Sequence, residues 1–214
     1  DYTLNNKFSF NAGAGYVAQP VRSSRDDDIN SVKKNNHGHF FAQGEYRASE
    51  KFMLITGFRY DKYSLYQSSF SPKLSMLFKA NRKISFTASV GKGFKTPAFR
   101  QLYLNFTNNA AGGYSVFGSL EAQSQITKLD NEGQILSKET DYYKLTDLKP
   151  ESSIGINAGM KWHASPKVNV DVNLFRNDID NMIDYRLVAY YTDGAQIFSY
   201  INVNKVYTQG AELN

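Results

Sequence analysis

Cysteine is absent from the 214-residue chain, which excludes a disulfide framework and a thiolate metal site. No run of 18 apolar residues occurs, so the sequence predicts no membrane-spanning helix. A membrane β-barrel remains compatible with that absence, because its strands need only alternate between apolar and polar residues. Nucleophile elbows, P-loops and zinc-binding motifs are also missing, so we expect neither an enzyme nor a resident cofactor.

Charge of either sign is modest, with a net value of +5 and basic residues scattered along the chain. Neither an RNP-like nor a helix-turn-helix pattern accompanies that charge, so we do not expect nucleic acid as a partner. Aromatic residues, in contrast, are abundant: the chain has 15 Tyr and 15 Phe, although its mean hydropathy is −0.50. This combination suits strands with one face in lipid and the other in water.

The clearest pattern lies in the stretches 84–103 and 148–162, where every second residue is apolar. The apolar positions are Ile84, Phe86, Ala88 and Val90 in the first stretch, then Ile154, Ile156, Ala158, Met160 and Trp162 in the second. Small or polar residues occupy the positions between them. A period of two predicts extended strands with one apolar and one wet face.

Similar alternation predicts strands over about residues 8–18, 40–48, 52–61, 72–80, 168–174, 197–203 and 206–214, after a stub at 1–4. Short turns are expected at five places, each with a lysine: Lys7, Lys51, Lys83, Lys167 and Lys205. Longer loops are expected from about residues 19, 62, 96 and 177. Because short and long connections alternate, an up-and-down meander would place all tight turns on one rim.

Strand length agrees with a membrane barrel, since about ten residues tilted near 45° span about 24 Å. A soluble β-sandwich would also alternate, but it has no reason to gather every long loop on one rim. The expected strands number about nine to ten including the stub. An open sheet with one apolar face lacks partners for its edges, so we expect a segment of a larger barrel.

Several strings resemble the TonB-dependent outer-membrane receptors of Gram-negative bacteria, of the ferric-siderophore and colicin receptor type. These strings are GFRYDKYS from Gly57, SPKLSMLFKA from Ser71, ASVGKGFKTPAFRQLY from Ala88, LKPESSIGINAGMKW from Leu148, VNLFRNDIDNMIDY from Val172 and YINVNKVYTQGAELN from Tyr200. The resemblance implies an antiparallel up-and-down barrel of 22 strands around an N-terminal plug. It also implies ligand capture by the outer loops and energy supplied through TonB.

On this resemblance, residues 1–214 are part of the barrel domain of an outer-membrane receptor, with a long extracellular loop at about 96–150 and the plug absent. The expected ligand is a ferric siderophore or other iron chelate. Other expected partners are the TonB complex, through the missing N-terminal region, the receptor's own plug, and outer-membrane lipid and lipopolysaccharide. The alternatives are a haem or cobalamin receptor of the same family, an outer-membrane barrel enzyme and a soluble carbohydrate-binding β-domain. No histidine lies between Phe94 and Glu151, which argues against haem.

One basic and aromatic group stands where a strand runs into the long loop, and it is our candidate ligand site. Its members are Lys92, Phe94, Lys95, Arg100, Tyr103 and Phe106. Cations attract anionic chelates, and aromatic faces stack on ligand rings. The alternative is structural, with the GFKTP string shaping the strand exit and the cations meeting lipopolysaccharide phosphates.

Four charged residues on neighbouring strands, Glu45, Arg47, Arg59 and Asp61, are expected to form an ion-pair network between barrel and plug. We expect Asp26, Asp27 and Asp28 to be a solvated loop run rather than a calcium site, because EF-hand spacing is missing.

Histidines at 37, 39 and 163 lack partners at metal-ligand spacing and are not expected to bind metal. Residues 119–145 are compatible with a helical hairpin or an extended flap that turns at 130–133. This insertion is hypothesised to be a lid over the ligand, with a contact to a partner as the alternative.

Overall fold

A computed structural model describes residues 2–22, 32–110 and 112–214. Asp26, Asp27 and Asp28 lie outside the described residues. The strands are β1 (Tyr2–Asn5), β2 (Phe8–Val17), β3 (Pro20–Val21), β4 (Lys33–Lys34), β5 (His37–Arg47), β6 (Phe52–Tyr63), β7 (Ser69–Lys79), β8 (Ile84–Lys95), β9 (Asn105–Asn108), β10 (Tyr114–Phe117), β11 (Ile135–Lys138), β12 (Glu151–Ser165), β13 (Val168–Tyr191) and β14 (Gln196–Leu213). The helices are α1 (Phe99–Tyr103), α2 (Ser119–Asn131) and the 3₁₀ helix η1 (Thr140–Lys144). None of the helices in these ranges is long and apolar enough to cross a membrane.

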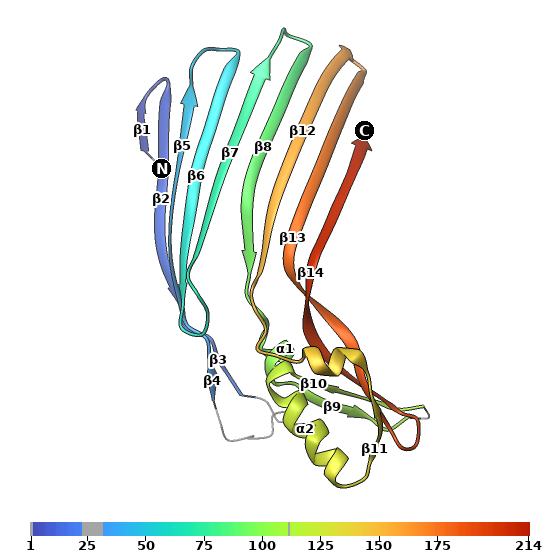
Figure 1. The fold of residues 1–214 in the computed structure, drawn as a ribbon. Coiled ribbons are helices and arrows are strands. Elements are labelled where there is room, and N and C mark those ends of the chain that lie inside the picture. The colour runs from blue at the N-terminus through green and yellow to red at the C-terminus, as the bar shows by residue number, and fades with distance from the viewer. Residues whose placement is uncertain (1, 23–31, 111) are drawn as a thin grey trace.

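The main sheet is an antiparallel meander in the order β1-β2-β5-β6-β7-β8-β12-β13-β14, and β14 then pairs in parallel with β10, which pairs with β9. Figure 1 shows this open, curved sheet with its tight turns at one end and the helices at the other. The predicted all-β, up-and-down barrel segment is therefore confirmed, and within the described residues the sheet does not close.

Four of the five predicted tight turns are present, and polar side chains preceding each lysine stabilise them. Asn5 Oδ1 accepts hydrogen bonds from the N–H groups of Lys7 and Phe8, and Asn81 Oδ1 accepts from Lys83 and Ile84. The hydroxyls of Ser49 and Ser165 accept in the same way from Lys51 and Lys167. Such local side-chain to backbone bonds explain why short Asn- and Ser-containing segments reverse the chain here.

The predicted turn at Lys205 is wrong, and so is the predicted loop over residues 177–196. Residues 196–213 form the single strand β14, which pairs with β13 from Val172↔Leu213 to Tyr190↔Gln196. The chain reverses instead at residues 192–195, where Gly194 has a φ of +88°. Among the described residues the meander therefore has eight long strands and the stub β1, and its last two strands continue past the rim.

Asn181, which lies within the wrongly predicted loop, and Asn202 form an irregularity in the middle of the β13–β14 pair. Asn181 has a φ of 55°, a conformation that asparagine tolerates better than most residues. The Asn202 side-chain amide donates to the carbonyl oxygens of Asn181 and Lys149, at 2.7 and 2.9 Å. Strand pairing continues on both sides of Asn181, from Asp180↔Lys205 to Met182↔Val203, so these residues are an irregularity within the strand pair rather than a break between strands. Figure 1 shows β13 and β14 twisting away from the sheet toward the long-loop end.

The strand registers place the even-numbered residues of β2, β5–β8, β12 and the first part of β13 on one face, which we call the outer face; in β14 the parity reverses, as in Val172↔Leu213. Paired residues in β2, β5–β8, β12 and β13 have the same parity, as in Phe40↔Tyr60 and Ala88↔Ala158. The large apolar side chains of this face that are exposed by 37–70% are Phe8, Phe10, Tyr16, Phe40, Tyr46, Phe58, Tyr60, Phe70, Leu74, Met76, Phe78, Phe86, Val90, Ile154, Ile156, Trp162, Val168 and Leu174. Within the described ranges no second sheet covers them, as the barrel prediction requires and a sandwich would not allow.

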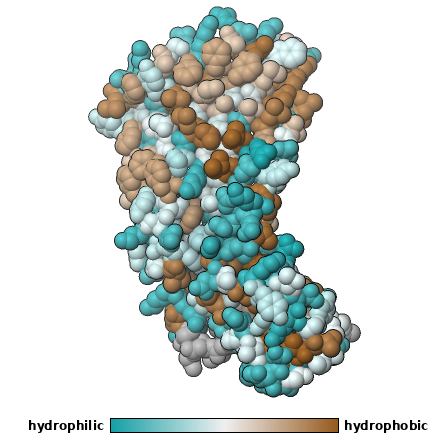
Figure 2. All heavy atoms as spheres, viewed as in Figure 1, coloured by the Kyte–Doolittle hydropathy of each residue, from teal (hydrophilic) through white to brown (hydrophobic). Residues whose placement is uncertain are grey.

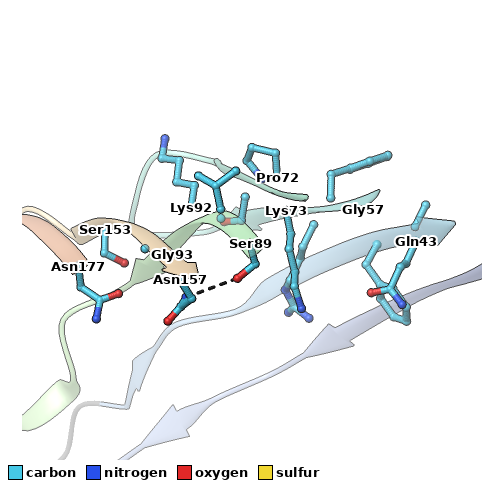
Figure 3. Close-up of a pocket in the computed structure, with 18 residues that line it drawn as sticks. Gln43, Gly57, Pro72, Lys73, Ser89, Lys92, Gly93, Ser153, Asn157 and Asn177 are labelled. Carbon is cyan, nitrogen blue, oxygen red and sulfur yellow. Dashed lines mark hydrogen bonds between the residues drawn. The ribbon is translucent and has the colours of Figure 1, made fainter. Parts of the chain in front are cut away.

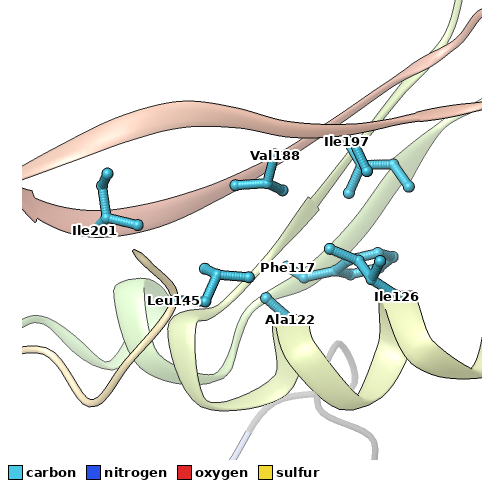
Figure 4. Packing of buried hydrophobic residues seen from close by; sticks show 8 residues of the cluster. Phe117, Ala122, Ile126, Leu145, Val188, Ile197 and Ile201 are labelled. Carbon is cyan, nitrogen blue, oxygen red and sulfur yellow. The ribbon is translucent and has the colours of Figure 1, made fainter. Parts of the chain in front are cut away.

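A small unit at the long-loop end contains the main buried core. Figure 4 shows Val188, Ile197 and Ile201 of β13 and β14 facing Ala122 and Ile126 of α2, and Phe117 and Leu145 complete the contact. Residues 119–145 are therefore one helix followed by β11 and η1, neither a helical hairpin nor an extended flap. The predicted turn at 130–133 is confirmed, with Gly133 at a φ of +69° directly after the helix. In the view of Figure 2, hydrophobic residues gather nearer the tight turns, and hydrophilic residues dominate toward this unit.

Candidate ligand-binding site

Odd-numbered residues of β2, β5–β8, β12 and the first part of β13 form the opposite, inner face, which is mostly small or polar. A groove of about 460 Å³ crosses strands β5 to β8, β12 and β13 on this face. Figure 3 shows Gln43, Lys73, Ser89, Asn157 and Asn177 around it, with the Asn157 amide donating to Ser89 Oγ at 3.5 Å. This surface offers amides, hydroxyls and a lysine to whatever fills the barrel.

Lys92, the first residue of the predicted ligand group, has its side chain on the outer face. In Figure 3 it points away from Ser89 and Asn157, on the same side of the sheet as Pro72. Its register partner Ile154 is an exposed apolar residue of the same face. The structure thus separates Lys92 from the inner groove, even though its backbone borders that groove.

Lys95 and Glu151 form an ion pair at the long-loop end of the inner face, where β8 and β12 separate into the long loop. Lys95 Nζ donates to both oxygens of the Glu151 carboxylate, at 3.0 and 3.1 Å. Glu151 also accepts the N–H of Ile183 at 3.0 Å. The carboxylate is largely buried and the lysine is exposed, so Glu151 fixes the position of a cation that faces solvent.

An aromatic cluster lies beside this ion pair at the long-loop end of the sheet, beyond the last β7–β8 pair Lys73↔Gly91; there Phe94 no longer follows the even–odd assignment of faces and contacts Tyr63. We call it the mouth cluster; it comprises His37, Tyr63, Tyr66, Phe94 and Tyr103. The Tyr63 ring centroid is 5.1 Å from that of His37, 5.7 Å from Phe94 and 6.4 Å from Tyr66. Tyr66 and Tyr103 both pack on a second buried group, formed by Leu102, Leu148 and Ile183. These contacts make an aromatic wall that spans β5, β6, β8 and α1.

Tyr66 carries a polar group into this wall. Its burial, together with the neighbouring Tyr103, raises the pKa of the Tyr66 phenol to about 12. Like any tyrosine, the phenol is protonated at neutral pH and has a hydrogen to donate. Its hydroxyl oxygen is buried and has no hydrogen-bond partner among the described residues.

The remaining predicted residues lie around the mouth cluster rather than in one patch. Arg100 is exposed on α1, and Lys33 Nζ of β4 stands 4.8 Å from the Tyr103 ring centroid. Phe106 lies on β9, 6.0 Å from the ring of Tyr114. The predicted group is thus divided: Phe94 and Tyr103 belong to the mouth cluster, Lys95 lies beside it, and Phe106 belongs to the small unit with β10.

The four residues of the predicted barrel–plug network form two separate ion pairs. Arg47 Nε lies 2.6 Å from Glu45 Oε1 near the tight turns. Arg59 binds the Asp61 carboxylate near the mouth cluster, with Nη2 2.8 Å from Oδ1. Each pair joins residues i and i+2 of one strand, so both project inward, and contact with a plug stays a prediction.

Buried polar atoms without hydrogen-bond partners are concentrated around the mouth cluster. Of the seven in the described part of the chain, five belong to Asn35, His37, His39, Tyr66 and Ser69. Such atoms cost roughly 1–3 kcal/mol each when they stay unpaired, and native proteins have few of them. Their concentration in one place makes this region a candidate for binding something polar.

Sequence reasoning did not include Tyr63, Tyr66, His37 or Lys33 in the site. Tyr63 could have been found, because it continues the odd-numbered series of Arg59 and Asp61 along β6. Tyr66 and Lys33 could not, since they reach the cluster through loop geometry and through pairing of β3 with β4.

Comparison with known families matches the whole chain, residues 1–214, to the family described as TonB dependent receptor-like, β-barrel. Comparison with curated protein sequences gives no match.

Solved structures with a similar fold include the siderophore receptor PirA from Pseudomonas aeruginosa, with 17% identity, a TM-score of 0.75, and coverage of 96% of this chain and 35% of that one. The ferric enterobactin receptor PfeA from the same organism, in complex with BCV-L6, gives 18% identity, a TM-score of 0.68, and coverage of 96% and 30%. The hemophore receptor HasR of Serratia marcescens, in complex with its hemophore HasA and heme, gives 16% identity and a TM-score of 0.67. This match covers 99% of this chain and 37% of that one. The chain thus spans about a third of the length of these structures.

Proposed function

The chain belongs to the TonB dependent receptor-like β-barrel family, whose members are transport receptors rather than enzymes, and from this premise we propose that it forms part of an outer-membrane importer of an iron chelate. In this proposal residues 1–214 are a segment of a larger barrel that surrounds a plug. The outer face meets lipid and lipopolysaccharide, the inner face meets the plug, and the TonB complex supplies energy through a region outside this chain.

The observation that carries the choice of ligand is the pairing of cations with the mouth cluster. Lys95 and Arg100 are exposed near Phe94 and Tyr103, and Lys33 stands over the Tyr103 ring. Ferric siderophores are bulky and commonly anionic, so cations attract them while aromatic faces stack on their planar groups. The fold likeness to the siderophore receptors PirA and PfeA agrees with this ligand class.

Haem is the second candidate, because the hemophore receptor HasR has a similar fold and His37 lies in the mouth cluster. An axial histidine would be the expected protein ligand of haem iron. The long loop between Phe94 and Glu151 contains no histidine, which favours the iron chelate.

The test is uptake of radioactive iron by cells that carry the full-length receptor and lack other iron receptors. We expect ferric siderophore uptake that disappears when TonB is deleted, while binding at the cell surface persists. Arg100→Glu should raise the half-saturation concentration by about five- to tenfold, because reversing a cation near the ligand opposes an anionic chelate.

Arg82→Glu is the matched control, since Arg82 lies in the tight turn between β7 and β8, at the other rim. It should leave uptake unchanged. If the cells grow on haem and take it up but bind no siderophore, haem replaces the iron chelate as the ligand. Uptake of neither would contradict the proposal.

A further inference from the structure

His37, His39 and Asp61 lie together on the inner face, where β5 pairs with β6. His37 and His39 are two residues apart on one strand, so both rings project to the same side. Asp61 is the register partner of His39. One potential ligand atom from each of the three residues lies within 4.8 Å of the other two. Sequence spacing could not show this group, because the third member comes from the neighbouring strand.

The local packing leaves space for the histidine rings. Gly15 of β2 is the register partner of His39 on its other side, and a Cβ atom at residue 15 would lie 2.5 Å from His39 Cε1. A glycine at this position therefore lets the imidazole lie flat against β2. The centroids of the His37 and His39 rings are 6.0 Å apart, so the two rings are neighbours.

The bonding of the three side chains is incomplete. The Nδ1 atoms of both histidines are buried and have no hydrogen-bond partner among the described residues. Asp61 is buried, and its carboxylate accepts from Arg59 Nε and Nη2 at 2.8–3.0 Å. The guanidinium occupies one side of the carboxylate and holds its orientation, as outer-shell partners of metal ligands do. Asp61 retains lone pairs for a second partner.

We propose that His37, His39 and Asp61 bind one divalent transition-metal cation of the Zn²⁺ class at the long-loop end of the inner face. Two neutral imidazoles and one carboxylate are a ligand set that suits Zn²⁺, Ni²⁺ or Cu²⁺. Mg²⁺ and Ca²⁺ prefer oxygen ligands and would be bound poorly. Ligands about 2.1 Å from Zn²⁺ in a tetrahedron are about 3.4 Å apart, so side-chain rotations close the site without moving the strands. The site takes a bare cation and does not depend on the ligand proposed for transport.

The test is a zinc titration of the full-length protein folded in detergent, against a chromogenic chelator. We expect one site that competes with the chelator for Zn²⁺. Millimolar Mg²⁺ or Ca²⁺ should not displace the bound Zn²⁺. His39→Gln and Asp61→Asn should each weaken binding at least tenfold. Gly15→Ala should weaken it similarly without removing a ligand, because the added Cβ displaces the His39 ring.

His163→Gln is the control, because His163 bonds to Asn169 near a tight turn at the opposite rim. It should bind zinc as the unmodified protein does. Gel mobility before and after heating checks that each variant folds. Zinc binding equal in the unmodified protein, His39→Gln and Gly15→Ala would overturn the site, and so would tighter binding of Ca²⁺ than of Zn²⁺. Iron-chelate uptake is a separate assay, so failure here leaves the proposed transport function standing.

Discussion

Leu74→Arg is expected to destabilise the folded barrel in lipid by roughly 2–4 kcal/mol, the cost of an arginine on the lipid face of a membrane strand near the midplane. Leu74 lies in the middle of β7, pairs with Thr56 and Val90, and is exposed on the outer face. A soluble protein would tolerate a charge at such an exposed position within about 0.5 kcal/mol. Equilibrium unfolding of the full-length receptor from phospholipid vesicles measures the difference.

Gln43→Arg is the matched control for Leu74→Arg. Gly44, the neighbour of Gln43, pairs with Thr56, and Thr56 also pairs with Leu74. The two substituted residues therefore lie at about the same height along the strands. Gln43 is exposed on the inner face, where an arginine lies among polar groups rather than in hydrocarbon. We expect a loss below about 1 kcal/mol. Equal losses for the two variants would mean that the two faces do not differ in environment.

Ile126→Ala is expected to lower the stability of the small unit by about 2–5 kcal/mol, because deleting buried methyl groups leaves a cavity. Ile126 is completely buried between α2 and the extensions of β13 and β14. The barrel part should be unaffected, since continuous strand pairing holds it. Hydrogen exchange at Val188 and Ile197, compared with exchange in β7, separates the two regions.

Leu120→Ala is the control on the same helix, since Leu120 is exposed. It should cost less than about 1 kcal/mol. Faster exchange throughout the sheet in Ile126→Ala would contradict the separation of the two units. The result also bears on the lid hypothesis for residues 119–145: if α2 opens over the ligand, it must give up this core or move together with the strand pair.

The sequence was sufficient to predict the barrel part, because one local rule governs it. Alternation assigns each residue to a face, and Asn or Ser before each lysine sets four of the turns. The same logic failed at Lys205, where Asn204-Lys205 has the composition of a turn but lies within a strand ladder. The long-range partner β13 decides the conformation there, and a local pattern cannot detect it.

The candidate site was only partly predictable for a related reason. Phe94, Lys95 and Tyr103 were found because they belong to one recognisable string, which runs from β8 into α1. Their partners Tyr63, Tyr66 and Glu151 come from three other segments, brought together by register and loop geometry. His37 and His39 acquire a metal-ligand partner only when β6 pairs with β5, so spacing along the chain missed Asp61.

Spin labels placed one at a time at residues 74 to 77 of the membrane-embedded receptor test most directly which face of the sheet meets hydrocarbon. Positions 74 and 76 should collide more with oxygen, which dissolves in lipid, and positions 75 and 77 more with a water-soluble nickel chelate. The two accessibilities should alternate out of phase with a period of two. Labels at 74 and 76 shielded from both reagents, as in a core between two sheets, would contradict the account.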